Sequence, residues 1–191
     1  MAVNQTGFPP SLTIWTIGHS TRPIEDFLAI LNAHDIARLV DVRTIPKSRH
    51  NPQFNSTLLA ASLIEVGIRY QHSPGLGGLR KPSKDSRNMG WKNPGFRGFA
   101  DYMGTTGFEA GLQELIQSAR QQRTAIMCAE ALWWHCHRSL ISDALLIRGI
   151  GVAHLMNQRK AEPHRLTPFA VIHNGRLGYP AGQPSLYDGI S

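Results

Sequence analysis

The sequence predicts an α/β fold: a three-layer α/β/α domain with a mainly parallel, doubly wound sheet of about five strands and a C-terminal hairpin. Short apolar runs alternate with amphipathic segments of helical period, and the connections are long enough for the crossovers that parallel strands need. Asn174-Gly175 separates two further short runs, which is typical of a hairpin turn. We expect one domain over residues 12–180, a flexible leader over 1–11 and a tail over 181–191.

Local patterns predict the individual elements. Strands are expected at 12–17, 37–42, 68–71, 124–128 and 151–156, and the hairpin strands at 169–172 and 176–179. Helices are expected from Pro23, from a cap on Asn55 or Ser56 to Gly67, near 96–103, from a capping box at Thr106, and from Arg138 to Arg148. The stretch 72–94 is rich in glycine and proline and is predicted to be a functional lid or a mobile segment.

Composition excludes several classes of protein. No apolar run reaches the roughly 18 to 20 residues that span a bilayer, so we expect no membrane helix. The first residues lack the pattern of a signal peptide, and two cysteines are too few for a disulfide scaffold, so we expect a cytoplasmic protein with free thiols. The motifs for nucleoside triphosphates, dinucleotides and standard zinc sites do not occur, and the sequence requires no cofactor.

Positive charge is concentrated in one segment. Ten basic and two acidic residues lie between Arg43 and Arg97, in a chain whose net charge is +7. Such a segment favours an anionic ligand, with nucleic acid or a nucleotide as candidates. A solvated basic surface explains the same charge without a partner.

The reactive residues fall where ligands bind in doubly wound sheets, beyond the carboxyl ends of the strands. The candidate catalytic residues are Asp41, Cys128, Glu130, Cys136 and His137, and the candidate substrate-binding residues are His19, Ser20, Arg43, Arg49, Asn51 and Arg138. Because they follow different strands, we expect distant parts of the chain to converge at one edge of the sheet.

The cysteine region predicts thiol chemistry. Cys136 is expected at or just before a helix N-terminus, where backbone N–H groups and the helix dipole favour a thiolate. Glu130 is a candidate general base, and Arg138 in the first helical turn is placed to hold an anion. The alternative is a small core residue at Cys128 and a structural ion pair between Glu130 and Arg138.

A metal site is a further alternative. Cys128, Cys136 and one of His135 or His137 supply three soft ligands within ten residues, which suits zinc with a fourth ligand or water. The candidate metal ligands are Cys128, Cys136 and His137. Their spacing matches no common zinc motif.

A second group of polar residues surrounds the end of the strand at 37–42. Arg43, Lys47 and Arg49 are placed to donate to phosphate oxygens. The alternative is that Asp41 and Arg43 brace the loop, and the two roles are compatible.

Several short motifs occur together in this order. They are Ile17-Gly18-His19-Ser20, Asp41-Val42-Arg43 with Pro46 and Ser48-Arg49, Leu76-Gly77-Gly78, Cys128-x-Glu130, Cys136-His137-Arg138, and His164 with Leu166-Thr167. Together they resemble the domain-of-unknown-function family four-eight-eight over roughly residues 12 to 180. The resemblance implies a three-layer α/β fold and a site at these positions, and it carries no activity. His135 departs from the pattern, which has a less constrained residue there.

The first functional hypothesis is a cytoplasmic enzyme with a Cys/Glu/Arg site that acts on a phosphate-bearing substrate, a nucleotide or nucleic acid. The alternative is a nucleic-acid-binding module without catalysis, in which the basic segment 43–97 makes the contacts and the cysteines are structural. The reactivity of the thiols separates the two hypotheses.

Overall fold

The chain folds into a six-stranded mixed sheet in the order β3-β2-β4-β1-β5-β6, seen in a computed structural model that describes residues 12–182. The strands are β1 (Thr13–Gly18), β2 (Arg38–Asp41), β3 (Arg69–His72), β4 (Thr124–Cys128), β5 (Gly151–Leu155) and β6 (Ala161–Pro163). The first five pair in parallel and β6 pairs antiparallel to β5. The predicted α/β fold with a mainly parallel sheet is confirmed.

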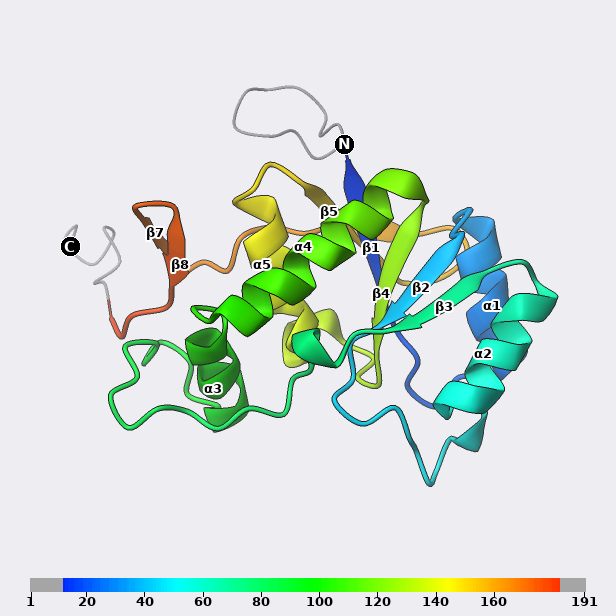
Figure 1. The fold of residues 1–191 in the computed structure, drawn as a ribbon, viewed down its shortest axis with the longest axis horizontal. Coiled ribbons are helices and arrows are strands. Elements are labelled where there is room, and N and C mark those ends of the chain that lie inside the picture. Colours follow the sequence, from blue (N-terminus) through cyan, green and yellow to red (C-terminus); the bar gives the residue numbers. More distant parts are fainter. Residues whose placement is uncertain (1–11, 183–191) are drawn as a thin grey trace, which may run out of the picture.

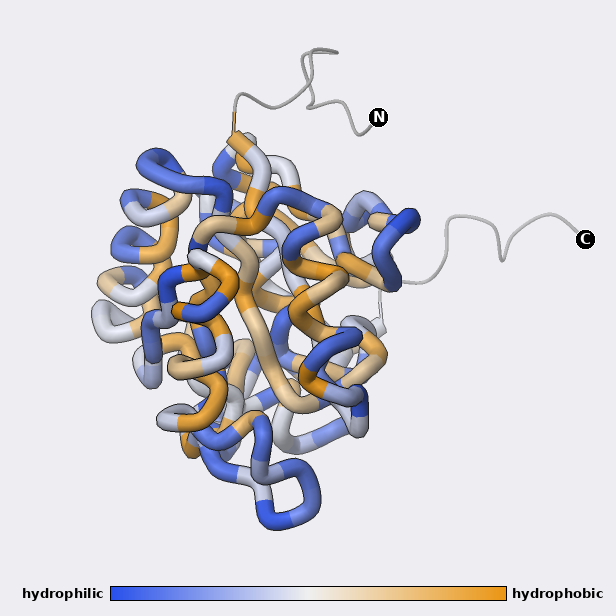
Figure 2. The backbone as a smooth tube through the Cα atoms, turned by 90° about the vertical axis from the view of Figure 1, so that its right-hand side faces the viewer, coloured by the Kyte–Doolittle hydropathy of each residue, from blue (hydrophilic) through white to orange (hydrophobic). Residues whose placement is uncertain are grey.

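Helices cover both faces of the sheet (Figure 1). They are α1 (Ile24–Ala33), α2 (Ser56–Glu65), α3 (Pro94–Tyr102), α4 (Thr106–Gln121) and α5 (Arg138–Leu146). Alternate residues of each strand point to opposite faces, so the core divides into two clusters. One packs α1 and α2 against the sheet, and the other packs α3, α4 and α5. Hydrophobic residues accordingly gather toward the inside of the molecule, whereas the outer turns and loops are mostly hydrophilic (Figure 2).

The C-terminal hairpin is present as predicted. It consists of β7 (Val171–His173) and β8 (Arg176–Gly178). Asn174 and Gly175 join them with φ angles of 50° and 73°, the left-handed conformation that this two-residue turn requires. The sequence did not predict β6, because its three residues include a proline and two exposed positions. Such a strand is tolerated at the edge of a sheet.

Two helix starts differ in detail from the predicted caps. Thr105, not Thr106, caps α4, and its hydroxyl accepts the backbone N–H of Phe108. Asn55 precedes α2, but its side-chain oxygen accepts the N–H of Ser48 instead of capping the helix. That hydrogen bond holds the loop after β2 against the start of α2.

The stretch 72–94 is anchored to α3. The carboxylate of Asp101 accepts hydrogen bonds from the backbone of Ser83, the hydroxyl of Ser86 and the amide of Asn88. The predicted leader, 1–11, and residues 183–191 of the predicted tail lie outside the described residues. Within residues 12–182, no helix is long and apolar enough to cross a membrane.

Candidate functional site

Strand register brings the candidate residues together at the carboxyl ends of the parallel strands. Gly18 at the end of β1 lies opposite Cys128 at the end of β4, and the next backbone N–H, of His19, donates to the Cys128 carbonyl at 3.0 Å. On the other side of β4, the N–H of Val42 donates to the carbonyl of Met127. The loops that follow β1, β2 and β4 therefore emerge side by side.

These loops, together with the segments 78–79 and 93–96, line an open cavity of about 430 Å3. Six of the predicted site residues line it: His19, Arg43, Cys128, Glu130, Cys136 and His137. Its wall also contains Lys47 and Gly78, and its rim includes the apolar side chains of Ile45, Leu79 and Phe96.

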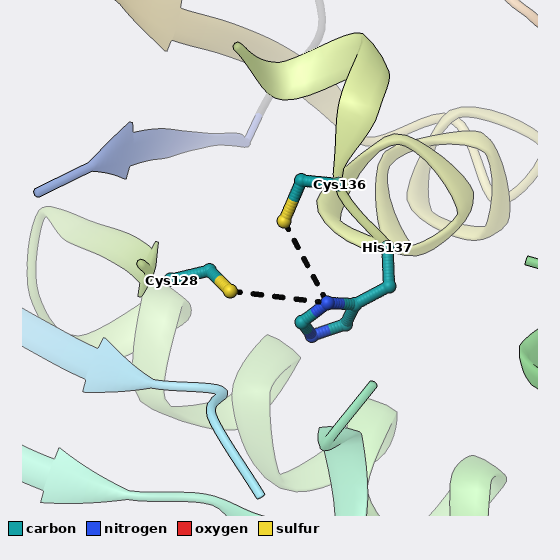
Figure 3. A group of neighbouring side chains, drawn as sticks. All are labelled: Cys128, Cys136 and His137. Atoms are coloured by element: carbon teal, nitrogen blue, oxygen red, sulfur yellow. Dashed lines mark hydrogen bonds between the residues drawn. The ribbon is translucent and has the colours of Figure 1, made fainter. Parts of the chain in front are cut away.

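Two sulfurs and one ring nitrogen converge at the wall of the cavity (Figure 3). Nδ1 of His137 lies 3.9 Å from Sγ of Cys128 and 3.6 Å from Sγ of Cys136. The three atoms lie within 4.8 Å of one another. We call Cys128, Cys136 and His137 the thiol cluster. Cys128 is fixed by β4, and the other two residues immediately precede α5.

The orientation of the imidazole is set by the main chain. Nε2 of His137 lies 3.0 Å from the carbonyl oxygen of Val42, and a carbonyl is an acceptor, so Nε2 carries a proton. Nδ1 is therefore the ring nitrogen that is left to accept a hydrogen bond from the thiols of Cys128 and Cys136.

The two thiols differ in acidity. Burial opposes ionisation of Cys136, but hydrogen bonds from Cys128 and His137 and the charge of Arg138 outweigh it, so the pKa of the Cys136 thiol is well below its usual value. The hydrogen bond to Cys136, together with burial, raises the pKa of the Cys128 thiol well above its usual value. Cys136 is thus the more acidic of the two thiols.

Arg138 lies beneath the cavity and is held by the protein itself. Its side chain is 1 % exposed, and its Nε approaches Sγ of Cys136 at 3.4 Å. One terminal nitrogen donates to the carbonyl of Glu130 at 2.6 Å and the other to the hydroxyl of Thr16 at 3.2 Å. The ion pair between Glu130 and Arg138, an alternative interpretation of the sequence, is not formed, because Arg138 donates to the backbone carbonyl of Glu130 instead. Gly18 makes room for it, since a Cβ there would meet the Glu130 carbonyl.

A buried chain of hydrogen bonds continues from Arg138 through the protein. The hydroxyl of Thr16 lies 2.7 Å from Nδ1 of His154, Nε2 of His154 lies 3.0 Å from Nδ1 of His164, and Nε2 of His164 lies 2.8 Å from Asp143. Arginine donates and a carboxylate accepts, so every bond runs in the direction from Arg138 to Asp143. We call these five residues the interior chain. It links one buried positive charge to one buried negative charge.

The opposite wall of the cavity is built on a buried ion pair between Asp41 and Arg43. Asp41 receives hydrogen bonds from Nε and Nη2 of Arg43, and from the hydroxyl of Tyr70. Nη2 of Arg43 also donates to the Phe54 carbonyl, and Nη1 lies 3.3 Å from Nε2 of His19. Asp41 thus braces Arg43, while one N–H of Arg43 on Nη1 is left for a ligand.

His19 is neutral in this wall. Its Nδ1 donates to the carbonyl of Ser20 at 2.7 Å, and its ring stacks on Phe54 with centroids 4.2 Å apart. Burial, reinforced by the charge of Arg43, lowers the pKa of His19 to about 4. Its Nε2 lone pair therefore accepts from Arg43.

The other predicted site residues lie outside the cavity wall. Asp41 and Arg138 are buried, and they contact Arg43 and Cys136, which do line the cavity. Ser20, Arg49 and Asn51 are not among the lining residues, and Arg49 is exposed.

Sequence reasoning missed the apolar rim and the interior chain. Ile45 and Leu79 are single apolar residues within polar, glycine- and proline-rich stretches, and that isolation is a signal that was available. Asp143, His154 and His164 follow no spacing that predicts contact with one another, and although His164 belongs to one of the motifs, nothing in the pattern joins these residues to Cys136.

Comparison with known proteins identifies the family. A family model described as Domain of unknown function DUF488 matches residues 23–145, more than half of the chain. No curated protein and no solved structure matches the chain significantly. The matched region contains the whole thiol cluster, Asp41 and Arg43, whereas His19, His154 and His164 lie outside it. The resemblance seen in the motifs is thus confirmed, and the chain belongs to the family described as Domain of unknown function DUF488.

Proposed function

We propose that this chain is an enzyme that uses the thiol of Cys136 on a small phosphate-bearing substrate of about the size of a nucleotide. The observation that carries the proposal is the convergence of Cys136, Cys128 and Nδ1 of His137 at the wall of a cavity of about 430 Å3. Cavities of this volume are typical of small-ligand sites.

The surroundings of Cys136 favour a reactive thiol. Nδ1 of His137, 3.6 Å from Sγ, is placed to take the thiol proton, and the bond from Nε2 to Val42 keeps the ring in that orientation. Nε of Arg138 then lies 3.4 Å from the sulfur that bears the negative charge. Arg138 therefore acts as a partner of the thiolate, and the cavity-lining cations are left to hold the substrate.

Two cations of the cavity support an anionic substrate. Arg43 keeps one N–H free after its bonds to Asp41, Phe54 and His19. Lys47 is exposed and takes part in none of the salt bridges found among residues 12–182. Because Asp41 offsets the charge of Arg43, Lys47 contributes most of the net attraction for an anion.

The apolar rim supports a substrate larger than a bare phosphate. Ile45 is 60 % exposed and Leu79 is 71 % exposed, and both line the cavity. An aromatic or aliphatic part of the substrate would cover these side chains and remove them from water. A nucleotide combines such a ring with a phosphate.

Two alkylating reagents of different charge test the site. Iodoacetate is anionic and iodoacetamide is neutral, so the ratio of their rates at Cys136, relative to free cysteine, measures the attraction for an anion. We expect a raised ratio that falls in Lys47→Ala and is unchanged in Lys160→Ala, whose lysine pairs with Glu162. The proposal is overturned if neither thiol reacts, or if the ratio of the iodoacetate and iodoacetamide rates at Cys136 equals that of free cysteine.

Turnover tests catalysis itself. A panel of nucleoside mono- and diphosphates is incubated with the protein, and the products are separated by chromatography. We expect turnover that is lost in Cys136→Ser and inhibited by inorganic phosphate. No turnover, combined with DNA binding that weakens steeply with salt, would favour the nucleic-acid-binding module over the enzyme.

A further inference from the structure

We propose that the thiol cluster is a binding site for one thiophilic divalent cation of the zinc class. The donors are Sγ of Cys128, Sγ of Cys136 and Nδ1 of His137, and they lie within 4.8 Å of one another. Tetrahedral zinc, with bonds of about 2.3 Å to sulfur and about 2.0 Å to nitrogen, sets its donor atoms roughly 3.5 to 3.8 Å apart. The two sulfur–nitrogen separations, 3.9 Å and 3.6 Å, are already close to these values.

The imidazole is held in the arrangement that a metal-ligating histidine adopts. Such histidines donate their second ring N–H to a carboxylate, a carbonyl or water, which fixes the tautomer and the direction of the ring. In this chain the carbonyl of Val42 accepts that bond from Nε2 of His137 at 3.0 Å. The lone pair of Nδ1 therefore faces the two sulfurs without any rearrangement of the ring (Figure 3).

The environment also suits the charge and coordination of the ion. Each thiol that binds gives up its proton, so two thiolates and a neutral imidazole would balance a divalent cation. Nε of Arg138 at 3.4 Å supplies a hydrogen bond to the sulfur of Cys136. Because all three residues line the cavity, a fourth position faces it and is open to water or a substrate oxygen.

Metal binding has a consequence for the reactivity proposed above, and this part of the inference rests on the proposed function. A bound cation engages both sulfurs, so Cys136 is no longer free to react as a thiolate. The metal-free chain then carries the thiol activity, and a cation of the zinc class inhibits it by occupying the same atoms.

Cobalt(II) is the probe, because thiolate-to-cobalt charge transfer and the visible bands of tetrahedral cobalt report the ligands directly. The full chain, reduced and metal-free, is titrated under anaerobic conditions. We expect one ion per chain, displacement by zinc, and at least tenfold weaker binding in Cys128→Ser, Cys136→Ser and His137→Gln. His135→Gln is the matched control, since His135 neighbours the cluster but is exposed, and its cobalt affinity should be unchanged.

The two proposals fail separately in this experiment. No charge-transfer band at one equivalent of cobalt, or a band that survives in His137→Gln, overturns the metal site. If Cys136 still reacts with iodoacetate in that case, the proposed thiol chemistry stands. Conversely, stoichiometric cobalt binding by a chain whose Cys136 resists alkylation even without metal supports the site and overturns the thiol enzyme. Circular dichroism confirms that each variant is folded.

Discussion

Gly78 packs so closely against His137 that a methyl group on Gly78 would lie 2.4 Å from Nδ1 of the imidazole. The same added carbon would lie 2.7 Å from Cγ of the ring, so no rotation about the ring axis relieves the contact. The second glycine of the Leu76-Gly77-Gly78 motif thus makes space for a cluster that is built from residues fifty or more positions further along the chain.

Gly78→Ala is therefore expected to displace His137 from the two sulfurs. Alkylation of Cys136 should slow and cobalt affinity should fall at least tenfold, because the ring leaves the position that Val42 fixes. Gly75→Ala is the control, since a Cβ added to Gly75 would lie no closer than 3.7 Å to its neighbours, which is an ordinary contact distance. Equal behaviour of the two variants would show that His137 does not set the reactivity of the cluster.

Arg138→Ala is expected to lower the free energy of unfolding by about 3 to 5 kcal/mol, the cost of breaking a buried ionic network from one end. The change leaves Asp143 without its compensating charge and removes the donor to the Glu130 carbonyl. Urea unfolding provides the measurement. Arg148→Ala, which breaks a partly exposed pair with Glu109, should cost less than about 1 kcal/mol. Unchanged stability in Arg138→Ala would instead indicate an arginine that is held ready for a ligand.

Asp41→Asn is expected to destabilise the fold by about 3 kcal/mol, since Arg43 would lose its buried counter-charge. Burial and the neighbouring Asp41 both raise the pKa of Tyr70, so the tyrosine should ionise at lower pH in the variant. Ultraviolet titration follows that ionisation and urea unfolding follows the stability. Asp26→Asn, on the exposed side of α1, should change neither quantity appreciably. A variant of Asp41 with the stability and the tyrosine titration of the wild type would contradict the bracing role.

Stability should fall as the pH falls from about 6.5 to 4. The unfolded chain takes up a proton on His19 near its ordinary pKa of about 6.5, whereas the folded chain, in which that pKa is about 4, does not. The unfolded state thus binds more protons in this window, and acidification favours it. His154, with a pKa lowered to about 2 by burial and by His164, acts in the same direction over a wider range.

Urea unfolding at pH 7.5 and pH 5 measures this dependence. The loss of stability between the two pH values should be smaller in His19→Gln than in the wild type. His173→Gln, at an exposed position of the hairpin, should behave as the wild type does. An identical loss in all three proteins would show that the burial of His19 does not govern the acid response.

The sequence predicted the strands and the thiol cluster because both depend on local patterns. Apolar runs and their flanking residues placed β1 to β5 within one or two residues, and Cys128, Cys136 and His137 lie within ten positions of each other. The role of Arg138 was not predictable in this way, because Thr16, which holds its other end, precedes it by 122 residues. Helical position alone predicts an anion-binding group, and the hydrogen bonds of this buried side chain to Thr16 and to the Glu130 carbonyl become visible only in the structure.

The interior chain has the composition of a catalytic proton relay, but it does not transfer protons. Moving a proton along such a chain requires each member to accept from one side and release to the other, ending on a group with a lone pair. Arg138 has no lone pair to offer, so the bonds through Thr16, His154 and His164 have one orientation and no route to reverse it. The interior chain is therefore a hydrogen-bond network of fixed direction, which does not carry protons. Both histidines keep their hydrogen on Nε2 throughout, and the thiol cluster must exchange its protons with the cavity rather than through the protein.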